Sequence, residues 1–424
     1  MAGAGELGAG ARRPAATGSS SSEQAAPPGP GGISLAVVGT GAVMLSLGRV
    51  GAALAALAAL SGAGFAAAED RRPLYDLRVF APVGQPGQPE PIAIGPGDGL
   101  VYVGTNQLER GDAHAPSKIF VYSRRGELRR ELTIEGQDLE EPHGIQGLAF
   151  DGRGRLFALD RAADPRVLVI GPRSGRQRTY SRFRDVPSCA AAGRTRNCSA
   201  TVGDATAEPD YAAFGPGGAL YVTDIEQALI WRVPRGGGRP SVWLTDSRLE
   251  SPFGPNGVQF MADGRTLMLA VTATGPDFGG SPTAGALFTV LLRRDGRPGE
   301  LRAFWRSRPV DGPDGFALGR SGRVYLALAG ASQIAVISAA GEEMARVPAG
   351  PIENAAEEIP VDAPGSVAFL GRRALITNHS ALRGDPSSWA VLDLFVAERG
   401  LPLHYPRIRP RGLREPDQRA VTGG

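Results

Sequence analysis

The sequence predicts an all-β fold, a six-bladed β-propeller of four-stranded blades that an N-terminal strand closes. Three observations predict it: a repeated strand–turn–strand pattern, a second pair of strands after most copies of that pattern, and many turn-forming residues. The chain has 424 residues, of which 60 are glycine and 35 are proline. This composition is typical of folds with many tight turns, and repeats of roughly 40 to 50 residues are typical of propeller blades.

The repeated pattern is a polar or small residue, an apolar triplet, a turn that usually contains glycine, and an apolar run. Two clear copies read NGVQFMADGRTLMLAV and DGFALGRSGRVYLAL. Six copies follow one another at intervals of 46 to 64 residues, which is about the length of a four-stranded blade. The copies begin at Glu90, Gln146, Asp210, Asn256, Asp314 and Gly365.

The other half of each blade follows the repeated pattern. Five copies precede two further strands joined by a glycine turn, as in SKIFVYSRRGELRREL, whereas the sixth is followed only by the run from Trp389 to Val396. The run from Leu74 to Val83 precedes the first copy and has no partner of its own. We expect it to complete the last blade, because closing the ring removes an exposed sheet edge.

The residue pattern of the N-terminal region predicts that it contains an export signal. Residues 1–32 hold almost no large apolar side chains and are expected to be a disordered or non-native extension. Residues 33–68 contain Arg49, an alanine-rich apolar core and the small residues Ala66 to Ala68, as a secretory signal does. The alternative is a membrane anchor over Ile33 to Leu60, against which Arg49 argues. The propeller is expected over 69–402, followed by a Pro/Arg-rich tail over 403–424.

The cysteine and charge content indicates in which compartment the protein is found and which kinds of partner it has. Cys189 and Cys198 lie in the insertion between the second and third copies, and in an exported protein they predict a disulfide. Two thiols without a nearby histidine make a poor zinc site. The 46 basic and 43 acidic residues nearly balance, which does not favour a nucleic-acid binder, since such proteins carry a clustered excess of positive charge. We expect an exported, periplasmic or secreted monomer that touches the membrane only if the N-terminal segment is not cleaved.

The first residues of the six copies predict a metal site. The innermost strand of each propeller blade lines the central channel, so equivalent strand starts should converge there. Oxygen ligands suit a hard divalent cation such as Ca²⁺, and three carboxylates around one channel repel one another without a cation. Each motif alone is also a common turn sequence, but the shared register favours a site. Five of the six residues carry side-chain oxygens: Glu90, Gln146, Asp210, Asn256 and Asp314.

The motifs Pro255-Asn256-Gly257 and Pro313-Asp314-Gly315 resemble those of the gluconolactonase/regucalcin (senescence marker protein) family of six-bladed propellers. The resemblance covers roughly residues 74 to 400. It implies a divalent cation, most often Ca²⁺, held by Glu90 together with the Asn and the Asp of these motifs. It also implies that Asp314 is the general base.

The chain departs from the family pattern at two positions. Asp210 stands where the family often has an asparagine that contacts the metal or the substrate. Pro91 follows Glu90 where the family usually has glycine, so the first repeat is the weakest match. Asp210 is therefore expected to be either a metal ligand or a substrate contact.

The expected function is metal-dependent hydrolysis of a lactone or a related ester. The cation would polarise the carbonyl and activate water, while Gln146 and Asp210 would contact the substrate. His143, three residues before Gln146, is the candidate proton shuttle, and His379 is placed similarly after the sixth copy. The alternatives are a non-catalytic exported binding propeller, yellow/royal-jelly-like or NHL-like, with a structural cation, or a strictosidine-synthase-like propeller. Lactone hydrolysis with and without a chelator distinguishes these classes.

Overall fold

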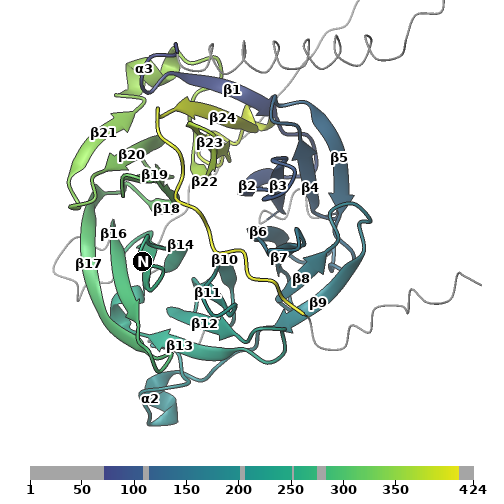
Figure 1. Ribbon diagram of the computed structural model, residues 1–424, viewed down its shortest axis with the longest axis vertical. Helices are drawn as coiled ribbons and strands as arrows, with labels where there is room; N and C mark the ends of the chain where they lie inside the picture. Colours follow the sequence, from purple (N-terminus) through teal and green to yellow (C-terminus); the bar gives the residue numbers. More distant parts are fainter. Residues whose placement is uncertain (1–70, 108–113, 201–205, 251–252, 275–282, 410–424) are drawn as a thin grey trace, which may run out of the picture. The chain divides into compact units, whose positions relative to one another are not determined.

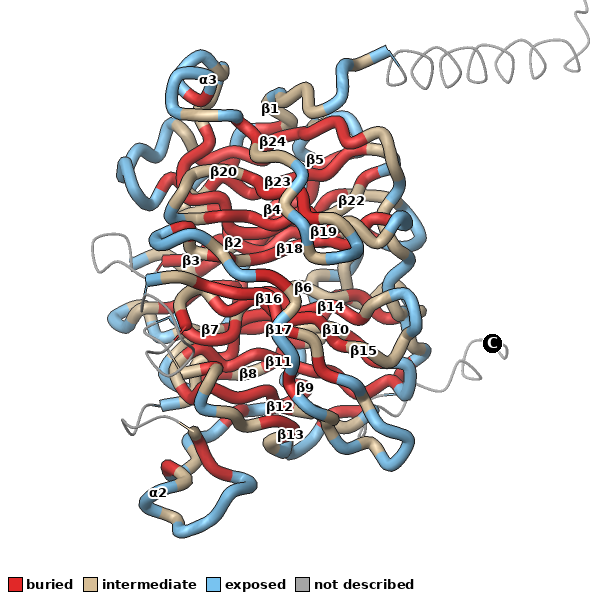
Figure 2. The backbone as a smooth tube through the Cα atoms, turned by 90° about the vertical axis from the view of Figure 1, so that its left-hand side faces the viewer, coloured by how far each residue is buried: buried red, intermediate tan, exposed pale blue. Residues whose placement is uncertain are grey.

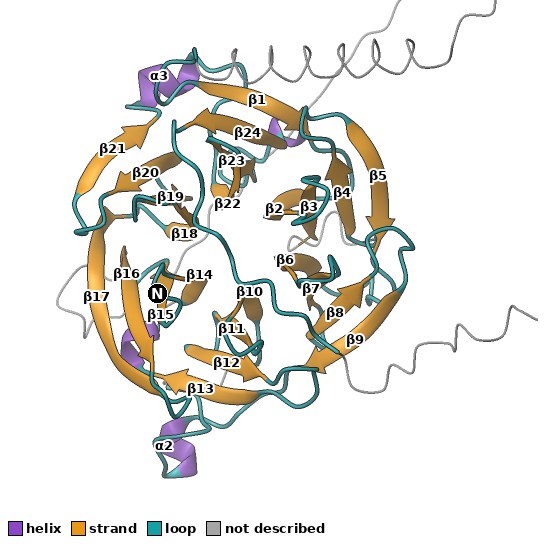
Figure 3. Ribbon diagram, viewed as in Figure 1, coloured by secondary structure: helices purple, strands orange, loops and turns teal. Residues whose placement is uncertain are grey.

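The strands that line the centre of the molecule begin where the sequence repeats begin. The computed structural model describes residues 71–107, 114–200, 206–250, 253–274 and 283–409. The expectations for residues 1–32 and 33–68, and for the part of the tail after residue 409, lie outside the described residues. Antiparallel strands surround a central axis in radial sheets (Figures 1 and 3). The innermost strands are β2 (Gln88–Ile94), β6 (His143–Phe150), β10 (Pro209–Phe214), β14 (Pro255–Phe260), β18 (Pro313–Leu318) and β22 (Pro364–Leu370).

Each innermost strand pairs with the strand that follows it, and two further strands complete the row outward. The second strands are β3 (Val101–Gln107), β7 (Leu156–Arg161), β11 (Leu220–Asp224), β15 (Thr266–Val271), β19 (Val324–Leu328) and β23 (Arg373–Asn378). The third strands are β4 (Lys118–Tyr122), β8 (Arg166–Ile170), β12 (Leu229–Val233), β16 (Ala284–Leu292), β20 (Gln333–Ile337) and β24 (Ala390–Phe395). The outer strands are β5 (Leu128–Thr133), β9 (Gln177–Arg182), β13 (Ser241–Thr245), β17 (Pro298–Pro309), β21 (Glu343–Val347) and β1 (Leu77–Pro82).

The helical elements of the described residues are short and lie in connections. They are α2 (Cys189–Ala192), α3 (Pro351–Ala355) and the 3₁₀ turns η1 (Ser247–Leu249) and η3 (Pro386–Ser388). No helix in the described part of the chain is long and apolar enough to cross a membrane. The radial antiparallel sheets confirm the predicted all-β propeller.

The division into blades agrees with the prediction in part. Within the described residues, four sheets are separate and four-stranded, whereas β2 to β9 form a single eight-stranded sheet. That sheet is continuous because β3 pairs with β6 through Asn106–Gly144 and Gln107–His143. The six innermost strands contact one another in sequence, and β22 contacts β2, so they form a closed ring around the channel.

The N-terminal strand closes the last sheet. β1 pairs antiparallel with β24, the third strand of the sheet that begins with β22. The buried carboxylate of Asp393 fixes this junction, because it accepts from Arg72 Nη1 at 2.8 Å and from Arg373 Nη1 at 2.6 Å. The pairing of 74–83 with 389–396 is thus present as the sequence predicts.

Apolar side chains between neighbouring sheets make the core. Figure 2 shows buried residues concentrated in the strands and exposed residues in the connections. The second strands are buried almost throughout because both of their faces are covered, as in β19, where all five residues are buried. Between two of the sheets the rings of Tyr221 and Phe260 meet edge to face with centroids 5.3 Å apart, a geometry that adds to burial.

The C-terminal segment after β24 crosses one end of the channel (Figure 1). We call residues 399–408 the C-terminal strap. Its first part is held by the hydrogen bonds from Arg320 N to Arg399 O and from Leu401 N to Leu318 O. Its last part is held by Gly152 N, which donates to Pro406 O, and by the fully buried Ile408. The strap therefore covers the channel at the end where the innermost strands finish.

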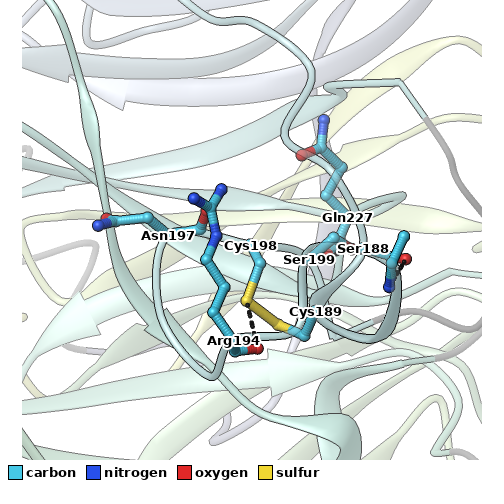
Figure 4. Close-up of a disulfide and its surroundings, with 8 residues drawn as sticks. Ser188, Cys189, Arg194, Asn197, Cys198, Ser199 and Gln227 are labelled. Atoms are coloured by element: carbon cyan, nitrogen blue, oxygen red, sulfur yellow. Dashed lines mark hydrogen bonds between the residues drawn. A yellow bond between two sulfur atoms is a disulfide. The ribbon is translucent and has the colours of Figure 1, made fainter.

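The cysteines form the predicted disulfide (Figure 4). Cys189 and Cys198 are bonded at 2.04 Å and close a small loop around α2, between β9 and β10. The loop is tied to the propeller by Ser199 Oγ, which donates to Gln227 O at 2.8 Å. A disulfide is typical of an oxidising compartment.

Replacing both cysteines with serine should free this loop from its crosslink. A crosslink that closes a loop of about ten residues is expected to stabilise the folded loop by about 2–3 kcal/mol. We expect faster tryptic cleavage at the exposed Arg194 and Arg196, with little change in the melting temperature of the propeller. Limited proteolysis with peptide mapping measures this. Equal cleavage rates with and without the disulfide would contradict it.

Candidate functional site

A β-bulge marks the start of every innermost strand. At each bulge the inner strand carries one residue more than the strand that pairs with it, and such bulges re-aim side chains. The shared register of the sequence repeats is therefore a structural feature of all six strands. The bulges fall between Pro89 and Ile92, Ile145 and Gly147, Pro209 and Ala212, Pro255 and Val258, Pro313 and Phe316, and Pro364 and Val367.

The glycines beside the bulge residues let neighbouring strands approach closely. A Cβ atom at Gly257 would lie 2.7 Å from Asp314 O, and one at Gly315 would lie 2.7 Å from Gly365 O and 2.6 Å from Tyr211 Oη. A Cβ at Gly147 would lie 2.7 Å from Asp210 O. The glycines of the PNG and PDG motifs are therefore required by close packing around the channel.

Replacing Gly315 with alanine should destabilise the protein by about 2–4 kcal/mol, because backbone atoms of the next strand would have to move. Gly217→Ala is the matched control, since a Cβ there meets no atom within 4 Å. Chemical unfolding of both variants measures the effect. A Gly315→Ala protein as stable as the Gly217→Ala protein would contradict the close approach.

Three carboxylates from three different innermost strands lie at this end of the channel, two of them buried and the third, Asp314, half-buried. Glu90 is 7% exposed and Asp210 is 3% exposed. Burial raises the pKa of Glu90 to about 7, against the opposing effect of a hydrogen bond from Tyr211. Burial first, and then the charges of Asp314 and Glu90, hold the pKa of Asp210 well above its usual range. The pKa of Asp314 is raised by burial and by Glu90. The structure thus brings these predicted residues into one electrostatic cluster.

Two oxygens of this cluster lack a partner in the protein. Asp210 Oδ2 and Asp314 Oδ1 are buried without a hydrogen bond, and so is Gln146 Oε1 from the neighbouring strand β6. Buried oxygens without partners are unfavourable and rare in folded proteins. They are therefore positions where a bound ligand would add interactions that the chain itself does not supply.

Tyr211 fills the middle of the cluster, and the sequence reasoning missed it. Its hydroxyl lies 3.3 Å from Glu90 Oε1 and 3.2 Å from Gly365 O. Burial and the surrounding carboxylates raise its pKa well above the usual value, so it stays protonated and can donate. The signal was present in the repeat. Tyr211 is the one large side chain at the second position of the repeat. The other copies have proline, glycine or serine there: Pro91, Gly147, Gly257, Gly315 and Ser366.

His379 joins the cluster from the end of β23. Its Nε2 atom lies 3.3 Å from Glu90 Oε2, although the pair lacks hydrogen-bond geometry. Burial lowers the pKa of His379 to about 4. At neutral pH the imidazole is therefore uncharged beside a carboxyl group that holds its proton unusually tightly.

Asn256 is oriented by its neighbours. Its Nδ2 atom donates to Thr272 Oγ1 at 2.7 Å, and Thr272 Oγ1 donates in turn to Pro313 O at 2.8 Å. Because the amide nitrogen is engaged, the oxygen is the atom of Asn256 left for a ligand.

His143 is placed apart from the carboxylates. Its ring is fully buried, with Nδ1 2.8 Å from Glu141 O and Nε2 2.9 Å from Ala115 O. Both ring nitrogens are thus engaged by backbone carbonyls, which leaves neither of them free to shuttle a proton in this conformation. His379, not His143, is the histidine that the fold places next to Glu90.

The donor atoms suit a hard cation better than zinc. Among the residues that the structure describes, no three His, Cys, Asp or Glu side chains stand close enough together to hold a metal ion. The cluster offers oxygens from three carboxylates and two amides, several of them without partners. Ca²⁺ accepts such mixed oxygen ligands, including amide and backbone oxygens. The oxygen donors present therefore match Ca²⁺ in chemical type, but the carboxylates among the described residues do not stand close enough together to enclose an ion.

Comparisons with known proteins support the fold. No family model matches the chain, and no curated protein matches it. A solved candidate gluconolactonase is 15% identical, with a TM-score of 0.50 over 77% of this chain and 94% of that chain. The PQQ-bound aldose sugar dehydrogenase of Streptomyces coelicolor is 16% identical, with a TM-score of 0.51 over 76% and 98%. The regucalcin of Agrobacterium tumefaciens, described as calcium-binding, is 17% identical, with a TM-score of 0.48 over 78% and 99%.

These likenesses show the fold and not an activity. The expected resemblance to gluconolactonase propellers is present in the fold. A PQQ-bound aldose sugar dehydrogenase has a similar fold, and propellers in general host unrelated functions. The function must therefore be argued from the channel residues.

Proposed function

We propose that this protein is an exported, cation-dependent hydrolase of a lactone or a related ester. We count its eight-stranded sheet as two blades, so that six blades surround the site. The observation that carries the proposal is a group of three carboxylates from three different strands. Burial raises the pKa of each of them, neighbouring carboxylates add to the shift at Asp210 and Asp314, and one buried oxygen of each of these two has no partner. Such a group is stabilised by a cation or by bound protons.

Glu90, Asp210, Asp314 and Asn256 would hold a divalent cation, most often Ca²⁺ for oxygen donors. When bound, the cation would supply Lewis-acid polarisation of a carbonyl and a more acidic water. Asp314 would accept the proton of the attacking water. Tyr211, a hydroxyl donor buried among these acids, would orient the ester oxygen, and Gln146 would contact the substrate.

Hydrolysis of a panel of γ- and δ-lactones, glucono-1,5-lactone included, tests this function. We expect at least one lactone to be hydrolysed in the presence of Ca²⁺, the activity to be lost with a chelator, and added Ca²⁺ to restore it. Activity that survives complete removal of divalent cations would overturn the cation dependence. A protein that binds the cation but hydrolyses no lactone or ester would be a binding propeller instead.

A further inference from the structure

The channel holds a second compartment beyond Tyr211. A cavity of about 510 Å³ lies between Tyr211 and the C-terminal strap, and the second halves of the innermost strands form its walls. Glu90, Asp210 and Asp314 do not line it. Tyr211 lies between the acidic cluster and the cavity, because its hydroxyl donates a hydrogen bond to Glu90 while the residue also lines the cavity. The acidic cluster and the cavity are thus two separate environments in one channel.

The cavity exists because the apolar triplets of the repeats have small central residues. Five copies carry alanine at this position, and all five line the cavity: Ala93, Ala149, Ala213, Ala317 and Ala368. The fourth copy has Gln259 instead, whose Oε1 accepts from Leu318 N at 3.2 Å. Flanking residues such as Val258 and Phe316 make the remaining wall apolar.

The rim of the cavity is positively charged. Arg124, Arg320 and Arg399 line it and are exposed to solvent. No aspartate or glutamate occurs among the described residues that line it. Arginine side chains at the mouth of an apolar cavity favour an anionic group there, and guanidinium matches a carboxylate in two-point geometry.

The strap gives the cavity a cover that can admit a ligand. Both of its ends are hydrogen-bonded to the propeller, whereas its middle, Pro402–Tyr405, makes no hydrogen bond to the other residues that the structure describes. Leu403 in this middle part is 50% exposed. Displacing these four residues would cost packing but no backbone hydrogen bond.

We propose that this cavity binds an amphipathic monocarboxylate, with its apolar chain among the alanines and its carboxylate at the arginines. The volume lies within the range of ordinary ligand sites, which are mostly apolar with a few polar groups that orient the ligand. Burial of the ligand's apolar chain supplies the affinity. The arginines favour a ligand with a negative charge over one with a positive charge. The site is independent of the cation site proposed above.

Calorimetric titration of the full chain with decanoate tests the proposal, with decyltrimethylammonium as the probe of opposite charge. We expect one decanoate to bind per chain, at least tenfold more tightly than decyltrimethylammonium. Arg320→Glu combined with Arg399→Glu should weaken decanoate binding at least tenfold. The exposed Arg239, which does not line the cavity, gives the control Arg239→Glu, for which no change is expected.

Two further variants test where decanoate binds. Ala213→Phe should block the cavity and remove decanoate binding, with circular dichroism and melting temperature as checks of folding. Asp314→Asn should leave decanoate binding intact, because Asp314 does not line the cavity. Absence of saturable decanoate binding, equal affinity for both probes, or indifference to the double arginine variant would overturn the proposal without affecting the proposed hydrolase function.

Discussion

Replacement of Asp314 with alanine is expected to abolish lactone hydrolysis, with a loss of at least about 100-fold in kcat. The change removes a cation ligand and the proposed base together. Asn256→Ala removes only a neutral ligand, so we expect it to weaken cation affinity and to regain part of its activity in excess cation. Initial rates at several Ca²⁺ concentrations separate the two outcomes, because only the Asn256 variant should respond to added cation.

The exposed Asp295, in the turn between β16 and β17, provides the matched control. Asp295→Ala makes the same chemical change far from the channel and should retain full activity. An Asp314→Ala protein with the rate and the cation affinity of the Asp295→Ala protein would contradict the assignment.

Without a bound cation, the free energy of unfolding should fall as the pH rises from about 4.5 to about 7. The pKa of Glu90 is about 7 in the folded protein against an ordinary value of 4.5, because burial disfavours its charge. The folded state therefore keeps a proton that the unfolded state releases in this range, and stability present below pH 4.5 is lost as the pH rises through 7. For Glu90 alone the expected loss is about 3 kcal/mol.

The titration of the groups next to Glu90 determines whether the free energy of unfolding rises or falls with pH overall. The raised pKa values of Asp210 and Asp314 act in the same direction as that of Glu90. His379 acts against them, because its pKa is lowered to about 4 and its contribution, present above pH 6.5, is lost as the pH falls through 4. Three carboxyl groups oppose one imidazole, so the net stability should decrease with rising pH.

Urea unfolding at pH 5 and pH 7.5, in chelator and in Ca²⁺, measures this dependence. Ca²⁺ should reduce the loss at pH 7.5, because it stabilises the ionised carboxylates and binds only the folded state. Glu90→Gln serves as the control for other titrating groups, and its pH dependence in chelator should be weaker than that of the unaltered protein. An identical pH dependence for both proteins would show that Glu90 does not carry the effect.

Much of the fold could be predicted from the sequence because each blade repeats the same pattern. The register of the repeats predicted the six innermost strands. The run from Leu74 to Val83, which has no partner of its own, predicted that an N-terminal strand, β1, closes the last sheet. The continuity of β2 to β9 could not be predicted, since it depends on the pairing of Asn106 and Gln107 with β6. Nothing in the local pattern of these two residues marks a contact between blades.

The candidate site was predicted in part for the same reason. Register alone brought Glu90, Asp210 and Asp314 to one end of the channel. Tyr211 was missed because repeats were compared at their first residue and not at the next one, where its size stands out. The C-terminal strap was missed because a Pro/Arg-rich segment carries no strand pattern, and its position depends on tertiary contacts such as the burial of Ile408.

A crystal structure of the protein soaked with Ca²⁺, with the ion located by anomalous scattering, tests the central claim most directly. The account predicts one ion at the starts of the innermost strands, coordinated by oxygens of Asp314 and Asn256 and of Glu90 or Asp210 at about 2.4 Å. A channel without an ion at saturating Ca²⁺, or an ion bound only elsewhere, would contradict it.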